Sequence, residues 1–338
     1  MRAQVQRGFG GDEVVAVEVV ADPRPGPGEV VVAVRACALN RLDLLQRSAP
    51  VVRGFSLPHI AGMDVAGVVV DGTATLPSGT RVLVDPVITC GVCSRCTAGL
   101  APYCEDLRTV GSTRPGGFAE LVAVPADHCY ELPPSMSFEA AAALPVAGMT
   151  AFHALEAGGY EPGQTVLVNG AGSGVSCALL ALLRARGSTV ITTAGGAAKV
   201  ARALEAGYDH AIDRQREDVV LRVVELTGGR GVDLVVDHVG PALFRESVAA
   251  LRIGGRMVFC GTTTGNEATL ALTDVYHWGR VLIGAGGYQA ADFPRMLAAF
   301  AAGPPPVIDS VRPFDELAEA QRAMAAGDFF GKLVVELG

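Results

Sequence analysis

A glycine-rich turn between an apolar strand and an apolar helix constrains the fold of this chain most. Residues 165–168 (TVLV) have the β-branched, apolar character of a buried parallel strand, and helical spacing begins at Cys177. The turn between them, residues 170–174 (GAGSG), departs from the pattern G-x-G-x-x-G, because Val175 stands where the third glycine is expected. Glycine turns also join strands to helices for steric reasons alone, so the turn by itself leaves both roles open.

The segment after this turn favours a dinucleotide site. Residues 188–194 read as a second strand and residues 197–206 as a second helix, which completes a β-α-β unit. In such a unit the pyrophosphate is held by backbone N–H groups at the N-terminus of the first helix. The predicted contacts are Gly170, Gly172, Ser173, Gly174 and Val175.

The rest of the chain divides into two regions with different predicted secondary structure. Before residue 145, short apolar strands alternate with Gly/Pro turns, which predicts a small β-barrel; residues 42–58 read as irregular. From Val146, strands alternate with helices, and about six strands fit a doubly wound parallel sheet. Residues 331–337 read as a strand that could rejoin the barrel.

Composition excludes several classes of protein. The 338 residues suffice for two domains, and 50% hydrophobic with 18% charged residues is ordinary for a globular protein. The net charge of −8, without a basic stripe, argues against nucleic-acid binding. No apolar run reaches the roughly 18 to 20 residues of a membrane span, and the N-terminus lacks a signal-peptide core. We therefore expect a soluble cytoplasmic protein.

Four cysteines are spaced C-x2-C-x2-C-x7-C, at Cys90, Cys93, Cys96 and Cys104. Four thiolates this close together can surround one tetrahedral Zn²⁺ and leave no open position, which predicts a structural zinc. Two disulfides or an iron–sulfur cluster are the alternatives, and the expected reducing compartment makes disulfides the weaker of them. Cys37, Cys129, Cys177 and Cys260 share no ligand spacing and are expected to be small buried residues.

Five further segments extend over most of the chain: residues 23–32 (PRPGPGEVVV), 59–69 (HIAGMDVAGVV), 144–155 (LPVAGMTAFHAL), 229–240 (GRGVDLVVDHVG) and 254–265 (GGRMVFCGTTTG). With the cysteines and the glycine turn, they resemble the medium-chain dehydrogenase/reductase superfamily. Within it, the chain is most similar to the quinone oxidoreductase-like branch, whose members reduce activated double bonds with NADPH.

The resemblance implies a GroES-like β-barrel catalytic domain at residues 1–145, with the zinc lobe at about 88–106. It also implies an NADPH-binding Rossmann domain at residues 146–284 and a C-terminal segment, 285–338, that returns to the catalytic domain. A homodimer or homotetramer is expected. The catalytic zinc of the alcohol dehydrogenase members is not expected, because its ligand positions match Asn40, Met63 and Val146, and the proton-relay hydroxyl matches Leu42.

The cofactor preference is predicted from the end of the second strand. An NAD site usually has an acidic residue about 20 positions after the glycine turn, where residues 193–199 contain none. The small residues Ala194 and Gly195 leave room for a 2′-phosphate, Lys199 could supply its counter-charge, and Arg214 is a second candidate. These features favour NADPH, although Lys199 could also be a solvated helix residue.

By the resemblance, two loops and two further residues reach the cofactor: Cys260, Gly261, Thr262, Ala285, Gly286, Thr150 and Lys332. Ordinary turn geometry or surface placement would explain them equally well. His153 and His238 lie on apolar elements and are expected in the core. Asn40 and Asp64 are the polar candidates that could face the nicotinamide.

The sequence thus predicts an NADPH-dependent oxidoreductase that reduces a quinone or a conjugated C=C bond of a small-molecule substrate without catalytic zinc. Zinc-free interconversion of alcohols and carbonyls is one alternative, and a non-redox NADPH-binding protein is another. Residues 44–58 and 276–278, expected to line the substrate pocket, carry no code that would identify the substrate.

Overall fold

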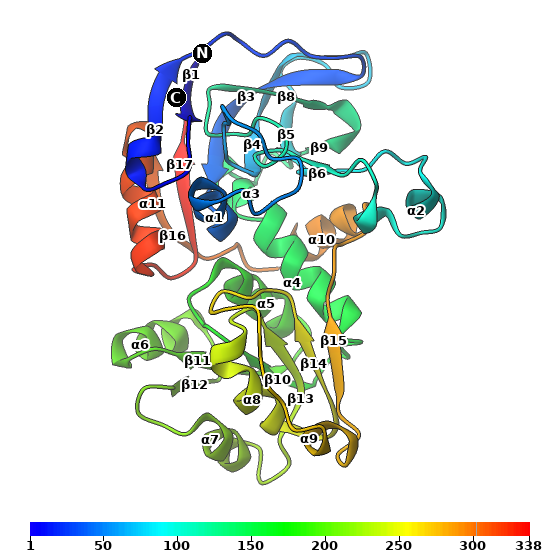
Figure 1. Ribbon diagram of the computed structural model, residues 1–338, viewed down its shortest axis with the longest axis vertical. Coiled ribbons are helices and arrows are strands. Elements are labelled where there is room, and N and C mark those ends of the chain that lie inside the picture. The colour runs from blue at the N-terminus through cyan, green and yellow to red at the C-terminus, as the bar shows by residue number, and fades with distance from the viewer. Residues whose placement is uncertain (302) are drawn as a thin grey trace. The chain divides into compact units, whose positions relative to one another are not determined.

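The computed structural model describes residues 1–301 and 303–338, and they form two compact units (Figure 1). The first unit contains Met1–Ala147, Gln289–Pro294 and Ile308–Gly338, and the second contains Gly148–Tyr288 and Arg295–Val307. The segment 285–338 therefore contributes to both. Two helices cross a unit boundary: α4 (Pro145–Ala157) and α10 (Asp292–Ala301).

The first unit is built around one mostly antiparallel sheet with the strand order β16-β17-β3-β4-β5-β9, and β8 also pairs with β3. Its strands are β16 (Ile308–Pro313), β17 (Lys332–Glu336), β3 (Glu29–Ala38), β4 (Asp64–Asp71), β5 (Arg81–Val84), β9 (Cys129–Glu131) and β8 (Leu121–Pro125). Two smaller antiparallel pairs are β1 (Arg2–Gln6) with β2 (Val15–Val19), and β6 (Val87–Ile88) with β7 (Arg108–Thr109).

The C-terminal strand completes this sheet, as predicted. β17 pairs antiparallel with β3, and Val335 lies opposite Cys37. Inward-facing residues of β3, such as Val32, form the core together with Phe118 and Leu333. The helices are α1 (Arg41–Ser48), α2 (Ser94–Thr97), α3 (Phe138–Ala142) and α11 (Leu317–Ala326), with short 3₁₀ turns at Asp12–Val14, Ala101–Tyr103, Ala126–His128 and Phe314–Glu316.

The prediction that residues 42–58 are irregular is wrong for the first part of that segment. Helix α1 begins after Asn40, whose backbone N–H donates to Asp43 Oδ2 at 2.7 Å in a capping box. This bond satisfies an amide that would otherwise be unpaired at the helix start. Local capping therefore produces a helix where the mixed composition did not suggest one.

The second unit is a parallel sheet of six strands, as the sequence predicts, and its strand order is β12-β11-β10-β13-β14-β15. Its strands are β10 (Thr165–Val168), β11 (Thr189–Ala194), β12 (His210–Asp213), β13 (Val232–Asp237), β14 (Leu251–Phe259) and β15 (Val281–Gly284). The helices are α5 (Gly174–Arg184), α6 (Ala197–Ala206), α7 (Val219–Leu226), α8 (Pro241–Ala249) and α9 (Thr273–Tyr276). The strand order reverses between β10 and β13, where ligands of such sheets bind.

Within residues 1–301 and 303–338, none of the helices combines the length and the hydropathy that crossing a membrane requires.

Candidate functional site

The glycine turn lies at the switch point of the parallel sheet. Gly170 follows β10 with a φ of 75°, a left-handed conformation that favours glycine. Ser173 caps helix α5, because its Oγ accepts a hydrogen bond from Ser176 N at 3.0 Å. The N–H groups of Gly174 and Val175 lie in the first helical turn and have no intrahelical acceptor. Together these features form the backbone cradle that a phosphate requires.

His238 lies beside this turn, just after β13, although the sequence suggested only a core role. Its Nε2 is 2.9 Å from Ser173 Oγ and 2.9 Å from Ser176 Oγ. A Cβ on Gly170 would lie 3.3 Å from the His238 ring. The ring therefore joins the two strand ends at the switch point, a role that only the strand order reveals.

Arg214 lies next to the turn that follows β11, where a 2′-phosphate was expected. A Cβ on Gly195 would lie 3.3 Å from Arg214 Nη2, and Arg214 is otherwise exposed. Asp213 is the acidic group nearest this turn, but its Oδ1 already accepts the N–H groups of Gly196 at 2.9 Å and Gln215 at 3.1 Å. Lys199 is half-buried in the first turn of α6.

The loops after β14 and β15 lie at the same edge of the sheet, because the strands are parallel. A Cβ on Gly261 would lie 2.8 Å from His238 O, so this position requires glycine for packing. The Ala285 carbonyl oxygen is 2.8 Å from His153 Nε2. Cys260, Thr262 and Gly286 lie in these loops, and half-buried Thr150 lies on α4.

The first unit contains a buried polar cluster around Lys332, on β17. Its ammonium donates to Leu39 O at 2.7 Å, to Asn40 Oδ1 at 2.9 Å and to Asp64 Oδ2 at 2.7 Å. Lys332 is 5% exposed and Asp64 0%. Asp64 Oδ1 also accepts Val146 N, near the start of α4, at 2.9 Å. All three ammonium hydrogens thus have acceptors within this unit.

Two further titratable groups adjoin this cluster. Burial, with a smaller contribution from the nearby Asp64 carboxylate, raises the pKa of Asp43 to about 7. Burial also raises the pKa of the Cys37 thiol well above its ordinary value. Both groups are therefore uncharged over much of the acidic to neutral range, which limits the negative charge that surrounds Lys332.

The positions that match the catalytic zinc ligands do not fit a metal. Asn40 directs its amide oxygen toward a cation, Lys332, and Val146 contributes only a backbone N–H, to Asp64. Met63 offers a thioether, which is not among the usual zinc ligands. A positive charge already occupies the place beside Asn40, so a second cation would be repelled.

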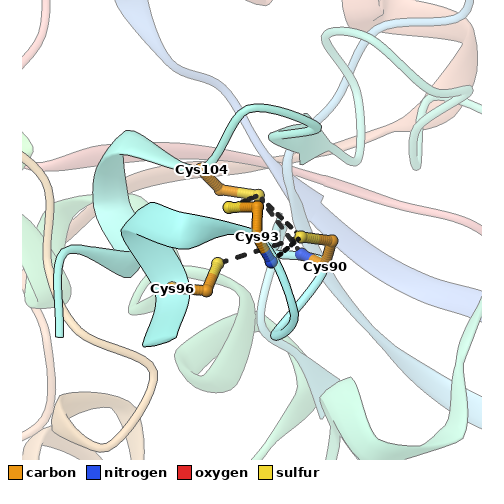
Figure 2. Close-up of side chains that lie close together, drawn as sticks. All are labelled: Cys90, Cys93, Cys96 and Cys104. Atoms are coloured by element: carbon orange, nitrogen blue, oxygen red, sulfur yellow. Dashed lines mark hydrogen bonds between the residues drawn. The ribbon is translucent and has the colours of Figure 1, made fainter. Parts of the chain in front are cut away.

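The cysteine lobe does fit a metal (Figure 2). The Sγ atoms of Cys90, Cys93, Cys96 and Cys104 all lie within 4.8 Å of one another and point toward a common centre. The Sγ–Sγ distances are 3.5 Å for Cys90–Cys104 and 4.0 Å for Cys93–Cys104. Tetrahedral Zn–S bonds of about 2.3 Å require sulfurs about 3.8 Å apart. These four residues could hold one Zn²⁺.

Backbone amides support the thiolate form of this cluster. Cys93 N donates to Cys90 Sγ at 3.3 Å, and Cys90 N donates to Cys104 Sγ at 3.3 Å. Hydrogen bonding from the backbone of Glu105 lowers the pKa of Cys93. The shell is closed by four protein ligands, so a metal held here would have no position for substrate.

The chain combines a parallel sheet that carries a glycine cradle with a second unit that carries a closed cysteine cluster. Two family models match the chain: the alcohol dehydrogenase GroES-like domain at residues 26–134, and the zinc-binding dehydrogenase domain at residues 174–302. The chain belongs to the medium-chain dehydrogenase/reductase superfamily, with a GroES-like domain and a Rossmann-type sheet.

Relatives with different activities cover the whole chain. The synaptic vesicle membrane protein VAT-1 homolog of Rattus norvegicus is 30% identical, over 100% of this chain and 84% of its own length. The alcohol dehydrogenase of Geobacillus stearothermophilus is 28% identical over 100% of both chains. The quinone oxidoreductase of Homo sapiens is 28% identical over 100% of this chain and 98% of its own.

Solved structures agree on the fold and differ in cofactor. An NAD-dependent alcohol dehydrogenase is 36% identical with a TM-score of 0.93, over 100% of both chains. A protein of Sinorhizobium meliloti 1021, described as a zinc-binding dehydrogenase and solved with NADP, is 26% identical with a TM-score of 0.87, over 99% of both chains. These similarities establish an oxidoreductase and leave its cofactor and substrate to be inferred.

Proposed function

We propose that this protein is an NADPH-dependent oxidoreductase that reduces a quinone or a conjugated, enone-type C=C bond of a small molecule without a catalytic metal. The observation that carries the proposal is the contact between Lys332 and Asn40, with Nζ 2.9 Å from Oδ1. By the resemblance, Asn40 matches a position at which alcohol dehydrogenases of this superfamily hold zinc, so an amide and an ammonium would stand there instead.

The contact fixes which hydrogen bonds Asn40 can offer. Because Oδ1 accepts from Lys332, the amide orientation is determined, and Nδ2 can only donate. Nδ2 is buried and has no hydrogen-bond partner among the described residues. A buried donor without an acceptor costs free energy, which a substrate oxygen would recover on binding.

A single amide donor suits a delocalised anion. Bound NADPH would supply a hydride, which adds to the β-carbon of an enone or to a quinone and leaves an enolate or a quinol anion. Asn40 Nδ2 would donate to that oxygen, and the buried charge of Lys332 would strengthen the donor. Reduction of a plain ketone places a full charge on one oxygen, which zinc-dependent relatives offset with the metal. The proton that completes the reduction would come from water or from an acid not yet identified.

A substrate panel tests this assignment. NADPH oxidation is expected with quinones and reactive enones, while enoyl thioesters and simple ketones turn over slowly or not at all. Protein treated with a chelator should retain this activity and should not oxidise secondary alcohols with NADP⁺. Robust alcohol oxidation without turnover of any conjugated acceptor would support the alcohol dehydrogenase alternative. Saturable NADPH binding without turnover of any compound would support a non-redox role.

We also propose that Arg214 and Lys199 select NADPH over NADH. Each replacement by alanine should weaken NADPH binding by about tenfold or more, since a charged hydrogen bond to phosphate contributes about 1.5–3 kcal/mol. Affinity for NADH, measured by fluorescence titration, should change far less. Arg216→Ala, at the exposed neighbour that pairs with Asp213 at 4.0 Å, is the matched control. Equal losses for both cofactors would show that neither residue binds the phosphate.

We also propose that the protein forms a homo-oligomer, either a dimer or a tetramer. β15 is an edge strand of the parallel sheet, and Val281 on it is 40% exposed. Near it in the chain, Trp278 is 47% and Tyr276 66% exposed. Exposed apolar edges tend to pair with another chain, and two copies of one strand can pair across a two-fold axis. Light scattering coupled to size-exclusion chromatography would measure the number of chains.

A further inference from the structure

The ends of β10 and β13 are joined through one imidazole. His238 Nε2 lies 2.9 Å from the hydroxyl oxygens of both Ser173 and Ser176, and the ring packs against Gly170. Ser173 caps α5, and Ser176 lies one turn further along. His238 follows β13 and thus connects that strand to the glycine turn after β10, where the pyrophosphate would bind.

The hydroxyl hydrogens indicate which tautomer the ring adopts. Ser176 Oγ donates to Asn169 O at 2.9 Å, and Ser173 Oγ donates to Ser176 Oγ at 3.0 Å. With both hydroxyl hydrogens used, Nε2 carries a hydrogen and donates to the oxygen pair. Nδ1 of the neutral ring then has no hydrogen and can accept a proton, which would leave the hydroxyl contacts intact.

We propose that His238 is a positioning residue for the dinucleotide: it holds the Ser173–Ser176 pair so that the glycine turn keeps its phosphate-binding shape, and it takes up a proton when a pyrophosphate binds there. This inference rests on the proposed dinucleotide function. The step is a proton transfer from solvent to Nδ1, with no change in oxidation state. The bound pyrophosphate supplies the negative charge that stabilises the resulting imidazolium.

The groups around His238 allow this protonation without competing for it. Asp237 is the charged neighbour, and its carboxylate accepts Asn169 Nδ2 and Gly240 N, each at 2.8 Å. Cys177, Tyr208 and Cys260, on the adjoining elements, have pKa values raised by burial and are neutral near pH 7.

The direction of the pH effect follows from linkage. Burial lowers the pKa of His238, so the ring is neutral at pH 8, and a bound pyrophosphate would raise that pKa again. The gain in dinucleotide affinity that comes from protonated His238 is fully present below the pKa that His238 has in the free protein. It is lost as the pH rises through the pKa that His238 has in the complex. Dinucleotide affinity should therefore increase as the pH falls from 8 to 6.

Calorimetric titration with NADP⁺ and NAD⁺ between pH 6 and 8 tests this inference. NAD⁺ is included because it has the pyrophosphate but lacks the 2′-phosphate, whose own pKa is about 6. The variants are His238→Ala and His238→Gln, in which the Gln amide can replace the Nε2 contact but does not titrate. His210→Asn, at the first residue of β12 and so at the opposite edge of the sheet from the glycine turn, is the matched control.

For both dinucleotides, the wild type and the His210→Asn variant should bind about threefold or more tightly at pH 6 than at pH 8. His238→Ala should bind about tenfold more weakly at pH 8, as expected for a lost buried hydrogen-bond network, and should lose the dependence on pH with NAD⁺. His238→Gln should restore most of the affinity at pH 8 and show no dependence on pH with NAD⁺. A pH dependence of NAD⁺ binding that persists in His238→Gln, or unchanged binding by His238→Ala, would overturn the inference. If the wild type bound no dinucleotide, both this inference and the proposed function would fall.

Discussion

Replacing Lys332 by methionine is expected to lower the free energy of unfolding by about 3–5 kcal/mol, the usual effect of removing one partner of a buried ion pair. The loss would leave the Asp64 carboxylate, which is 0% exposed, without its cation 2.7 Å away. Leu39 O and Asn40 Oδ1 would also lose their donor. Denaturant unfolding would measure the change, and Arg24→Met, at an exposed arginine in the loop before β3, is the control, with little expected effect.

A double variant separates the ion pair from general damage to the core. Asp64→Asn alone removes the carboxylate but keeps an oxygen that can accept Val146 N. Combined with Lys332→Met, it removes both buried charges, so we expect part of the lost stability to return. Reduction of conjugated acceptors should remain impaired in the double variant, because nothing then holds the Asn40 amide in its orientation. Strictly additive losses of stability would show that the pair is not energetically coupled.

The parallel sheet was predictable because most of its strands are short runs of apolar and β-branched residues. The strand at residues 165–168 was predicted with the bounds that the structure has, and so was helix α6. Strands buried on both faces must be almost wholly apolar, so their composition identifies them. The four-cysteine cluster was equally predictable from the sequence, because one short loop contains all four cysteines.

Elements that bury polar side chains were not predictable in the same way. The N-terminal strand β1 has the sequence RAQVQ, and its Gln4 and Gln6 are buried. Their amides find partners far along the chain: Gln4 bonds to Gln321 at 2.8 Å and Gln6 to Gln46 O at 3.2 Å. Because these partners are distant in sequence, no local pattern of apolar residues marks the strand.

The candidate site also depends on contacts between residues that are distant in the sequence. Asn40 and Lys332 were noted separately, as a polar candidate and as a cofactor contact, but their 2.9 Å contact joins residues 292 positions apart. His238 was predicted as a core residue, since nothing in the sequence places β13 beside β10. Strand order determines these neighbours, and it follows from packing of the whole sheet and not from local periodicity.

The zinc lobe offers little apart from its cysteines to hold it together. Of the lobe residues from Gly91 to Leu107, Cys104 is the buried one, and it is 6% exposed. The strands that flank the lobe, β6 and β7, are two residues each, too short to be stable alone. When a small segment lacks a core, metal binding supplies much of its folding free energy.

We therefore expect one tightly held zinc per chain, and replacing Cys93 by serine should reduce it to a small fraction of that amount. Three remaining thiolates bind zinc more weakly, and the segment from Cys90 to Cys104 should then exchange its amide hydrogens faster by orders of magnitude. Elemental analysis and hydrogen exchange measure the two effects, and Cys129→Ser, at a half-buried thiol outside the cluster, should show neither. The lobe contains no group proposed to touch substrate, so residual activity per folded molecule should survive the substitution. A wild-type zinc content of two or of zero, or unchanged zinc in Cys93→Ser, would contradict a single structural site built from these four cysteines.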